Sequence, residues 1–95
     1  MRFGLSNEIY QAIKSIVEKY KYCFKIFGSR ARGNYKKYSD IDIAIFENVI
    51  ESDEYKIRNE FDLLEIPYTI DLVFINSNTK KELLNSIIKE GVDLK

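Results

Sequence analysis

The chain has 95 residues, of which 15 are basic and 15 acidic, so its formal net charge is zero. This length predicts a single domain, residues 1–95, with one modest core. The sequence contains no histidine and one cysteine, which excludes Ser-His-Asp and Cys-His catalysis, histidine zinc sites and an internal disulfide. Any bound metal ion would need oxygen ligands, which favours Mg²⁺, Mn²⁺ or Ca²⁺.

Charge and hydropathy vary along the chain. No apolar run approaches the roughly 20 residues of a membrane helix, and the N-terminus lacks a signal-peptide pattern, so we expect a cytoplasmic protein with no membrane partner. Residues 1–38 carry nine basic and two acidic side chains, whereas residues 39–72 carry two basic and ten acidic ones. This split fits solvated faces of opposite sign, or an anion-binding first third facing a cation-binding middle. The zero net charge gives no strong sign of direct nucleic-acid binding.

The first third of the chain predicts a helix and a strand. The helix is expected over about Asn7–Lys21 with Ser6 as its N-cap. Its apolar stripe comprises Leu5, Ile9, Ala12, Ile13, Ile16, Val17 and Tyr20. The aromatic segment Tyr22–Phe27 predicts a short strand, in which Cys23 is interpreted as a buried apolar residue. Residues 30–38 are expected to form a short helical turn followed by a loop.

The remaining chain alternates strands and helices. Strands are expected at Asp40–Phe46 and Tyr68–Ile75, and helices at about Ser52–Leu64 and Lys80–Glu90. Pro67 prevents the first of these helices from continuing. Thr79 or Asn78 is expected near the N-cap of the last helix, and Gly91 at its C′ position. The order predicts a small α/β domain whose sheet has three strands or slightly more.

Gly28-Ser29 follows the first predicted strand, where a helical turn begins. Glycine lets backbone N–H groups approach a phosphate closely, and serine adds a hydroxyl donor. An ordinary turn has the same composition, so this dipeptide indicates a phosphate site only in combination with other features.

Three aspartates follow on the predicted strands. Asp40 and Asp42 are two apart on one strand and are expected on the same face, where a cation would relieve their repulsion. Asp71 lies in an otherwise apolar strand and can complete a three-carboxylate cluster if the two strands are neighbours. The alternatives are a solvated sheet edge for the pair and an exposed sheet face for Asp71.

Together these features predict a phosphoryl or nucleotidyl transfer site. Such chemistry requires mainly positioning and charge stabilisation, for which two cations held by carboxylates suffice. The third carboxylate can accept the proton of an attacking hydroxyl. No histidine is needed, in agreement with the composition.

The spacing of these residues resembles a known pattern. Gly28-Ser29, the ten residues Arg30 to Ser39 and then Asp40-Ile41-Asp42 resemble the Gly-Ser-x10-Asp-x-Asp motif of the DNA polymerase β-like nucleotidyltransferase superfamily. More narrowly, Gly-Ser-Arg-Ala-Arg-Gly followed by Tyr-Ser-Asp-Ile-Asp-Ile is similar to the MNT-type minimal nucleotidyltransferases of bacteria and archaea. The resemblance covers nearly the whole chain and implies the minimal nucleotidyltransferase α/β core, with a small mixed sheet flanked by helices.

The resemblance also implies a function. Asp40 and Asp42 would hold Mg²⁺, or Mn²⁺ in its place, with Asp71 as third ligand and candidate base. Gly28 and Ser29 would bind the terminal phosphates of a nucleoside triphosphate. Members of the family are commonly antitoxins of a HEPN toxin, and some transfer AMP from ATP to a tyrosine of that partner. Two alternatives are an antitoxin that acts by occlusion alone and a nucleotide-sensing regulatory subunit.

The residues around the motif leave alternatives open. Arg30 and Arg32 can contact the triphosphate, or instead pack against the loop or pair with an acidic residue. Ser39 can bond a phosphate or cap the turn. Lys36 and Lys37 are interpreted as solvated loop charges.

A partner surface is expected beside the carboxylates. If the two strands align, Phe46, Val73 and Ile75 share the face of the aspartates, and a partly uncovered apolar patch there would mark a protein interface. The alternative is that the last helix or a homodimer contact covers this patch.

Overall fold

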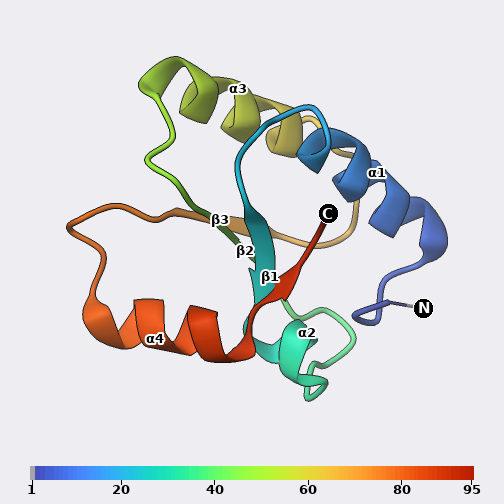
Figure 1. The fold of residues 1–95 in the computed structure, drawn as a ribbon. Helices are drawn as coiled ribbons and strands as arrows, with labels where there is room; N and C mark the ends of the chain where they lie inside the picture. The colour runs from blue at the N-terminus through green and yellow to red at the C-terminus, as the bar shows by residue number, and fades with distance from the viewer. Residues whose placement is uncertain (1) are drawn as a thin grey trace.

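The structure of the chain, a computed structural model, describes residues 2–95. Its elements follow in the order α1 (Asn7–Val17), β1 (Phe24–Phe27), α2 (Ser29–Arg32), β2 (Ile41–Ile45), α3 (Glu51–Asp62), β3 (Ile70–Phe74), α4 (Lys81–Glu90) and β4 (Val92–Asp93). The expected α/β class is confirmed (Figure 1). None of the helices in this part of the chain is long and apolar enough to cross a membrane.

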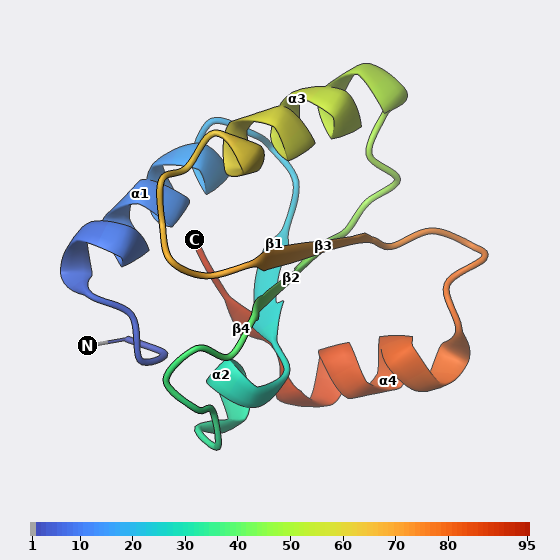
Figure 2. The ribbon, with the colours of Figure 1, turned by 180° about the vertical axis from the view of Figure 1, so that it is seen from behind.

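The four strands form one mixed sheet in the order β3-β2-β1-β4. Strand β1 pairs antiparallel with both β2 and β4, whereas β2 and β3 are parallel (Figure 2). The sequence did not predict β4, because two residues are too few to show an alternating pattern. The central strands β2 and β1 therefore have hydrogen-bonded neighbours on both sides.

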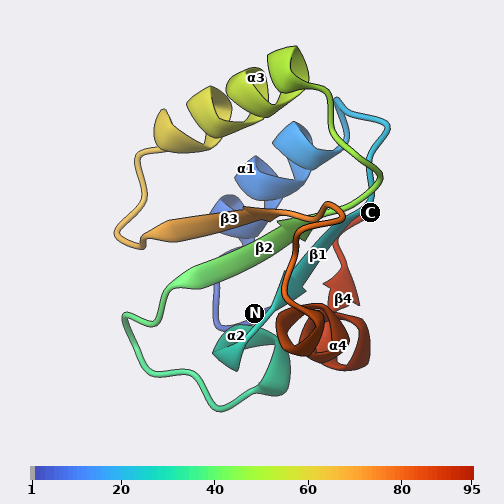
Figure 3. The same ribbon diagram turned by 90° about the vertical axis from the view of Figure 1, so that its left-hand side faces the viewer.

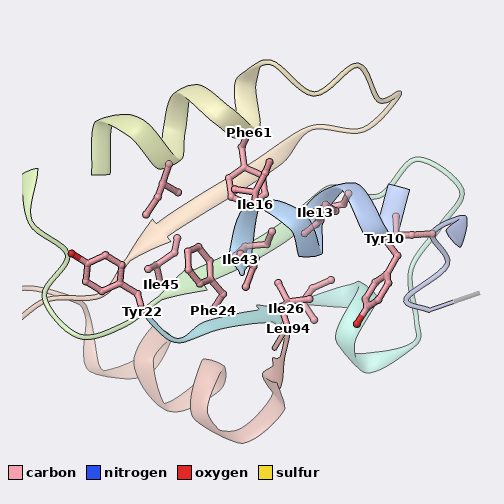
Figure 4. Close-up of a cluster of buried hydrophobic side chains, with 14 residues drawn as sticks. Tyr10, Ile13, Ile16, Tyr22, Phe24, Ile26, Ile43, Ile45, Phe61 and Leu94 are labelled. Carbon is pink, nitrogen blue, oxygen red and sulfur yellow. The ribbon is translucent and has the colours of Figure 1, made fainter. Parts of the chain in front are cut away.

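The sheet separates two layers of helices. Helices α1 and α3 cover one face, and α2 and α4 lie on the other side (Figure 3). The main core lies under α1 and α3, where Ile41, Ile43 and Ile45 of β2 are fully buried together with Ile57 and Phe61 of α3 (Figure 4). Because side chains alternate along a strand, the even-numbered residues of β2 face α2 and α4.

Helix α1 is shorter than its apolar stripe suggests. It ends at Val17, four residues before the expected Lys21. The Tyr20 N–H bonds the Val17 carbonyl at 3.3 Å, which closes a tight final turn. The Tyr20 hydroxyl then donates to Glu60 of α3, and Lys19 pairs with the same carboxylate. The segment that follows α1 therefore leaves the helical path to bond with α3.

The ends of the helices confirm one expectation and correct two. Ser6 caps α1, since its hydroxyl accepts a first-turn N–H at 3.3 Å. The N-cap of α4 is Lys80, whereas the Thr79 hydroxyl accepts from the Asn76 N–H at 2.9 Å in the preceding turn. Gly91 is extended (φ −67°, ψ 144°) rather than left-handed, because the chain passes directly from α4 into β4.

All three predicted strands, observed as β1, β2 and β3, are shorter than predicted, and α3 covers Glu51–Asp62 instead of 52–64. Strand β1 begins at Phe24, because the buried Tyr22 donates to Asp53 at 2.6 Å and so belongs to the contact with α3. Cys23 lies outside the strand and is half-buried, with its thiol 3.6 Å from Asp93. The expectation of a buried strand residue is thus corrected, because Cys23 precedes β1 and is only half-buried. Burial, followed by the Asp93 charge, raises the pKa of its thiol, which disfavours the reactive thiolate.

The hydrogen bonds from Lys19 and Tyr20 to Glu60 predict that the free energy of unfolding depends on pH. The Lys19 and Tyr20 hydrogen bonds lower the pKa of Glu60 below its ordinary 4.5, so its stabilising effect is present above that pH and is lost as pH falls. Glu60→Gln should therefore lower the free energy of unfolding at pH 7 by about 1 kcal/mol. Denaturant unfolding of both proteins between pH 7 and 3 should show this difference closing.

Glu54→Gln on the same helix is the control for this variant. Its partner Arg58 lies at 3.4 Å in an exposed i,i+4 pair, which contributes little in solution. An equal loss in both variants would show that Glu60 stabilises only through general charge on α3.

Candidate functional site

The register of three strands brings the motif residues together. Phe27, at the end of β1, pairs with Asp42 of β2, and Asp42 pairs with Asp71 of β3. Paired residues project from the same face, so both carboxylates lie on the face of α2 and α4. The sequence expectation that Asp71 joins Asp42 on neighbouring strands is confirmed by this register.

Gly28 connects β1 to α2 directly beside Asp42. Its backbone (φ 74°, ψ −156°) lies in a region that only glycine occupies easily. A Cβ at this position would lie 2.4 Å from Oδ2 of Asp42, well inside contact distance. The absence of a side chain therefore lets the Asp42 carboxylate pack against the turn that starts α2.

Asp42 carries the electrostatic cost of this arrangement. Burial raises its pKa above the ordinary 3.8, and the Asp71 and Asp40 charges raise it further. The nearby Arg32 charge acts in the opposite direction. The cluster thus has more negative than positive charge, as expected of carboxylates that bind a cation.

Asp40 lies differently from the prediction. Strand β2 begins at Ile41, so Asp40 is exposed at the end of the preceding loop, and strand alternation does not fix its direction. Its charge still acts on Asp42. Within residues 2–95, no three histidine, cysteine or carboxylate side chains converge closely enough to hold a metal ion together. The carboxylate oxygens of Asp40, Asp42 and Asp71 are of the chemical kind that Mg²⁺ and Mn²⁺ prefer.

Arg32 has a protein partner in the structure. Its Nη1 donates to Glu90 Oε2 at 2.8 Å, and its side chain remains 44% exposed. The sequence left open such a pairing with an acidic residue but gave no signal for Glu90, which lies at the far end of α4. The ion pair joins α2 to α4 close to Asp42.

The Ser39 hydroxyl caps a turn. It accepts from the Lys36 N–H at 2.7 Å, and the Ser39 N–H bonds the Lys36 carbonyl at 3.1 Å. Ser29 is half-buried at the first position of α2. Lys36 and Lys37 are exposed in the loop, as expected.

Arg30 is the most deeply buried charged residue described. Its side chain is 2% exposed and donates to the Ser39 carbonyl at 3.0 Å and to the Phe3 carbonyl at 2.9 Å. Of the two alternatives for Arg30, packing against the loop is the one the structure shows. The sequence could not reveal the Phe3 partner, because nothing in the motif indicates where the N-terminal turn lies.

The apolar residues beside the carboxylates are not fully open. Phe46, Val73 and Ile75 are half-buried, and α4 lies on their side of the sheet (Figure 3). Their partial exposure agrees with the partly uncovered apolar face expected from the sequence. Exposed apolar side chains also occur on α4, at Leu83 and Ile88.

A mixed sheet that aligns two strand carboxylates beside a Gly-Ser turn defines a minimal nucleotidyltransferase core. The sequence profile of the family described as "Polymerase beta, Nucleotidyltransferase" matches residues 11–95. The chain belongs to this family. No curated protein matches it.

Two solved structures share the fold. One is described as a crystal structure of "the toxin-antitoxin with AMP-PNP"; it is 21% identical, with a TM-score of 0.68 over 90% of this chain and 72% of that one. The other, a candidate nucleotidyltransferase from Sulfolobus solfataricus, is 24% identical, with a TM-score of 0.50 over 90% and 78% of the two chains. At these identities the likeness establishes the fold alone.

Two glycines of the motif allow a matched test of the Asp42 packing. Both Gly28 and Gly33 have positive φ, but a Cβ at Gly33 would contact nothing within 4 Å. Gly33→Ala should therefore cost about 1–2 kcal/mol from backbone strain alone. Gly28→Ala should cost more and should also displace Asp42. If Mg²⁺ and ATP bind at this site, they should raise the Tm of the wild-type protein, and Gly28→Ala should abolish that rise. Retention of that rise in folded Gly28→Ala would contradict the assigned packing.

The raised pKa of Asp42 predicts a second pH effect. Because its folded pKa lies above 3.8, ionised Asp42 destabilises the fold, and stability is lost as pH rises through the folded value. Asp42→Asn should therefore match or exceed wild type in Tm at pH 7 without ligand. The two proteins should converge toward pH 3, as measured by differential scanning calorimetry. A variant less stable than wild type throughout would assign Asp42 a structural role.

Proposed function

We propose that this protein is a Mg²⁺-dependent nucleotidyltransferase that transfers AMP from ATP to a protein hydroxyl, and thereby acts as an antitoxin. The observation that best supports this proposal is that Asp42 pairs with Asp71 on neighbouring strands and that Gly28 packs against Asp42. Membership of the nucleotidyltransferase family supports the reaction class.

The three aspartates have separate roles in this proposal. Asp40 and Asp42 hold Mg²⁺, or Mn²⁺ in its place, and Asp71 is the third ligand. The unbalanced negative charge around Asp42 favours such an ion. When bound, the ion neutralises charge on the phosphate oxygens and on the leaving pyrophosphate.

The reaction is a substitution at the α-phosphorus of ATP. The acceptor oxygen forms a bond to the α-phosphorus, and the bond between this phosphorus and the bridging oxygen breaks, so pyrophosphate leaves. Asp71 is exposed at the edge strand and accepts the proton of the attacking hydroxyl. The product is an AMP ester of the acceptor.

The Gly28-Ser29 turn and Arg32 bind the triphosphate. Gly28 allows close approach of the chain to the phosphates, and the Ser29 hydroxyl donates to them. Arg32 is exposed enough to exchange Glu90 for a phosphate oxygen, to which a guanidinium binds well. Ser39 supports this site from the loop and Arg30 supports it from α2, where it is too deeply buried to contact the phosphates directly.

The acceptor is proposed to be a tyrosine of a HEPN-type toxin in the cytoplasm. Asp71 is exposed on the edge strand β3, where a macromolecular acceptor can approach it. The structural likeness to a toxin–antitoxin assembly containing AMP-PNP supports both a toxin partner and a nucleotide substrate. A purely occluding antitoxin is the second candidate, favoured by the exposed Leu83 and Ile88 on α4.

Co-expression with the protein encoded next to this one tests the proposal. After incubation with Mg²⁺ and ATP, the intact mass of the partner should rise by one or more AMP units. Label from α-³²P-ATP, but not from γ-³²P-ATP, should enter the partner. Asp40→Asn should bind the partner equally well and leave its mass unchanged, because Asp40 is exposed and contributes little to folding.

The alternatives give different results. Co-purification with no mass change in the presence of Mg²⁺ and ATP would contradict transfer and favour occlusion. Neither association nor labelling of the partner would overturn the antitoxin assignment.

A further inference from the structure

Arg30 joins segments that precede two of the aspartates. Its Nε donates to the carbonyl of Ser39, the residue directly before Asp40, at 3.0 Å. Its guanidinium carbon lies 4.5 Å from the ring centre of Tyr68, three residues before Asp71. The buried Arg30 side chain therefore contacts both the segment that leads to Asp40 and the segment that leads to Asp71. We infer that Arg30 is a positioning residue that sets Asp40 relative to Asp71 for metal binding, an inference that rests on the proposed function.

The N-terminal turn holds Arg30 from the other side. Nη1 of Arg30 donates to the Phe3 carbonyl at 2.9 Å. The turn is closed by a 2.8 Å bond from the Leu5 N–H to the Arg2 carbonyl. Gly4 packs so tightly against the loop that a Cβ there would lie 2.2 Å from Cε1 of Tyr35. The N-terminal turn is thus part of the support for Asp40.

The β3 side of this junction is equally fixed. The Ile41 N–H donates to the Thr69 carbonyl at 2.9 Å, so the residue after Asp40 is bonded to the chain leading to Asp71. The Arg30 guanidinium lies close to both the Tyr68 ring and the Tyr35 ring, at 4.5 Å and 5.2 Å from their centres. These cation–π contacts and two directed N–H bonds together define one orientation of the guanidinium.

The energetics favour a geometric role over a purely stabilising one. The Arg30 side chain is 2% exposed, its recorded hydrogen bonds go to carbonyl groups, and Nη2 has no hydrogen-bond partner among residues 2–95. Burying a charge in this way costs free energy that an apolar side chain would avoid. What the guanidinium provides is a fixed distance between the Phe3 and Ser39 carbonyls. Asp40, although exposed, is held one peptide from that point.

Arg30→Lys tests this role, because lysine keeps the charge but its single ammonium cannot span both carbonyl groups while stacked on the rings. We expect Mn²⁺ binding in the presence of AMP-PNP, followed by the electron paramagnetic resonance of free Mn²⁺, to weaken about 10-fold. Gly4→Ala perturbs the same junction without changing Arg30, and should weaken Mn²⁺ binding in the same direction.

Tyr22→Phe is the matched control for stability. Tyr22 is buried at the opposite end of β1, where it bonds Asp53 and the Ile50 N–H. Its loss should lower Tm without changing Mn²⁺ affinity. Equal weakening in Tyr22→Phe would show that Arg30 acts only through stability and would overturn the inference.

The remaining outcomes are also decisive. Wild-type Mn²⁺ affinity in folded Arg30→Lys would overturn the positioning role. If Arg30→Lys does not fold, wild-type affinity in Gly4→Ala overturns it, and weakened affinity supports it. Failure of the wild-type protein to bind Mn²⁺ with AMP-PNP would overturn the proposed function itself, a result that the variants alone cannot produce.

Discussion

Burial of the isoleucines of β2 is the constraint on which the site depends. Ile41, Ile43 and Ile45 are fully buried under α1 and α3, so the strand cannot slip by one residue without exposing all three. The same alternation directs Asp42 to the opposite face, beside Gly28 and in register with Asp71. Core packing and site geometry are therefore fixed by a single choice of register.

The uneven distribution of charge has a structural counterpart. Basic side chains of the first third meet acidic ones from later in the chain, as in the Lys19–Glu60 and Lys25–Asp93 pairs. Near the motif, Arg32 offsets the charge of Asp42 while bonded to Glu90. These pairs agree with the interpretation of solvated charges of opposite sign, and the interpretation as binding surfaces for an anion and a cation stays a prediction for the charges at α2 and β2.

The parts of the molecule set by local pattern could be predicted from sequence. The alternation around Asp42 and Asp71 gave the strands and their faces, and Ser6 gave the start of α1. Features that depend on contacts distant in sequence could not be predicted. The chain turns away from α1 because Tyr20 bonds Glu60, and β4 forms because β1 provides a strand to pair with. For the same reason the sequence left open whether Arg30 contacts a phosphate or packs against the loop, because its Phe3 partner lies 27 residues away in the chain.

The two faces of the sheet divide stability from chemistry. The core under α1 and α3 contains nearly all the fully buried apolar side chains, whereas the face of α2 and α4 has few, among them Ala44 and Ile87. The carboxylates therefore repel one another on the face that contributes little apolar burial. For this reason the domain can fold without a ligand despite their repulsion. Asp42 nevertheless lies on a central strand, between β1 and β3. The cation proposed to bind here would relieve this charge on a central strand, and its binding would thereby be coupled to the stability of the whole domain.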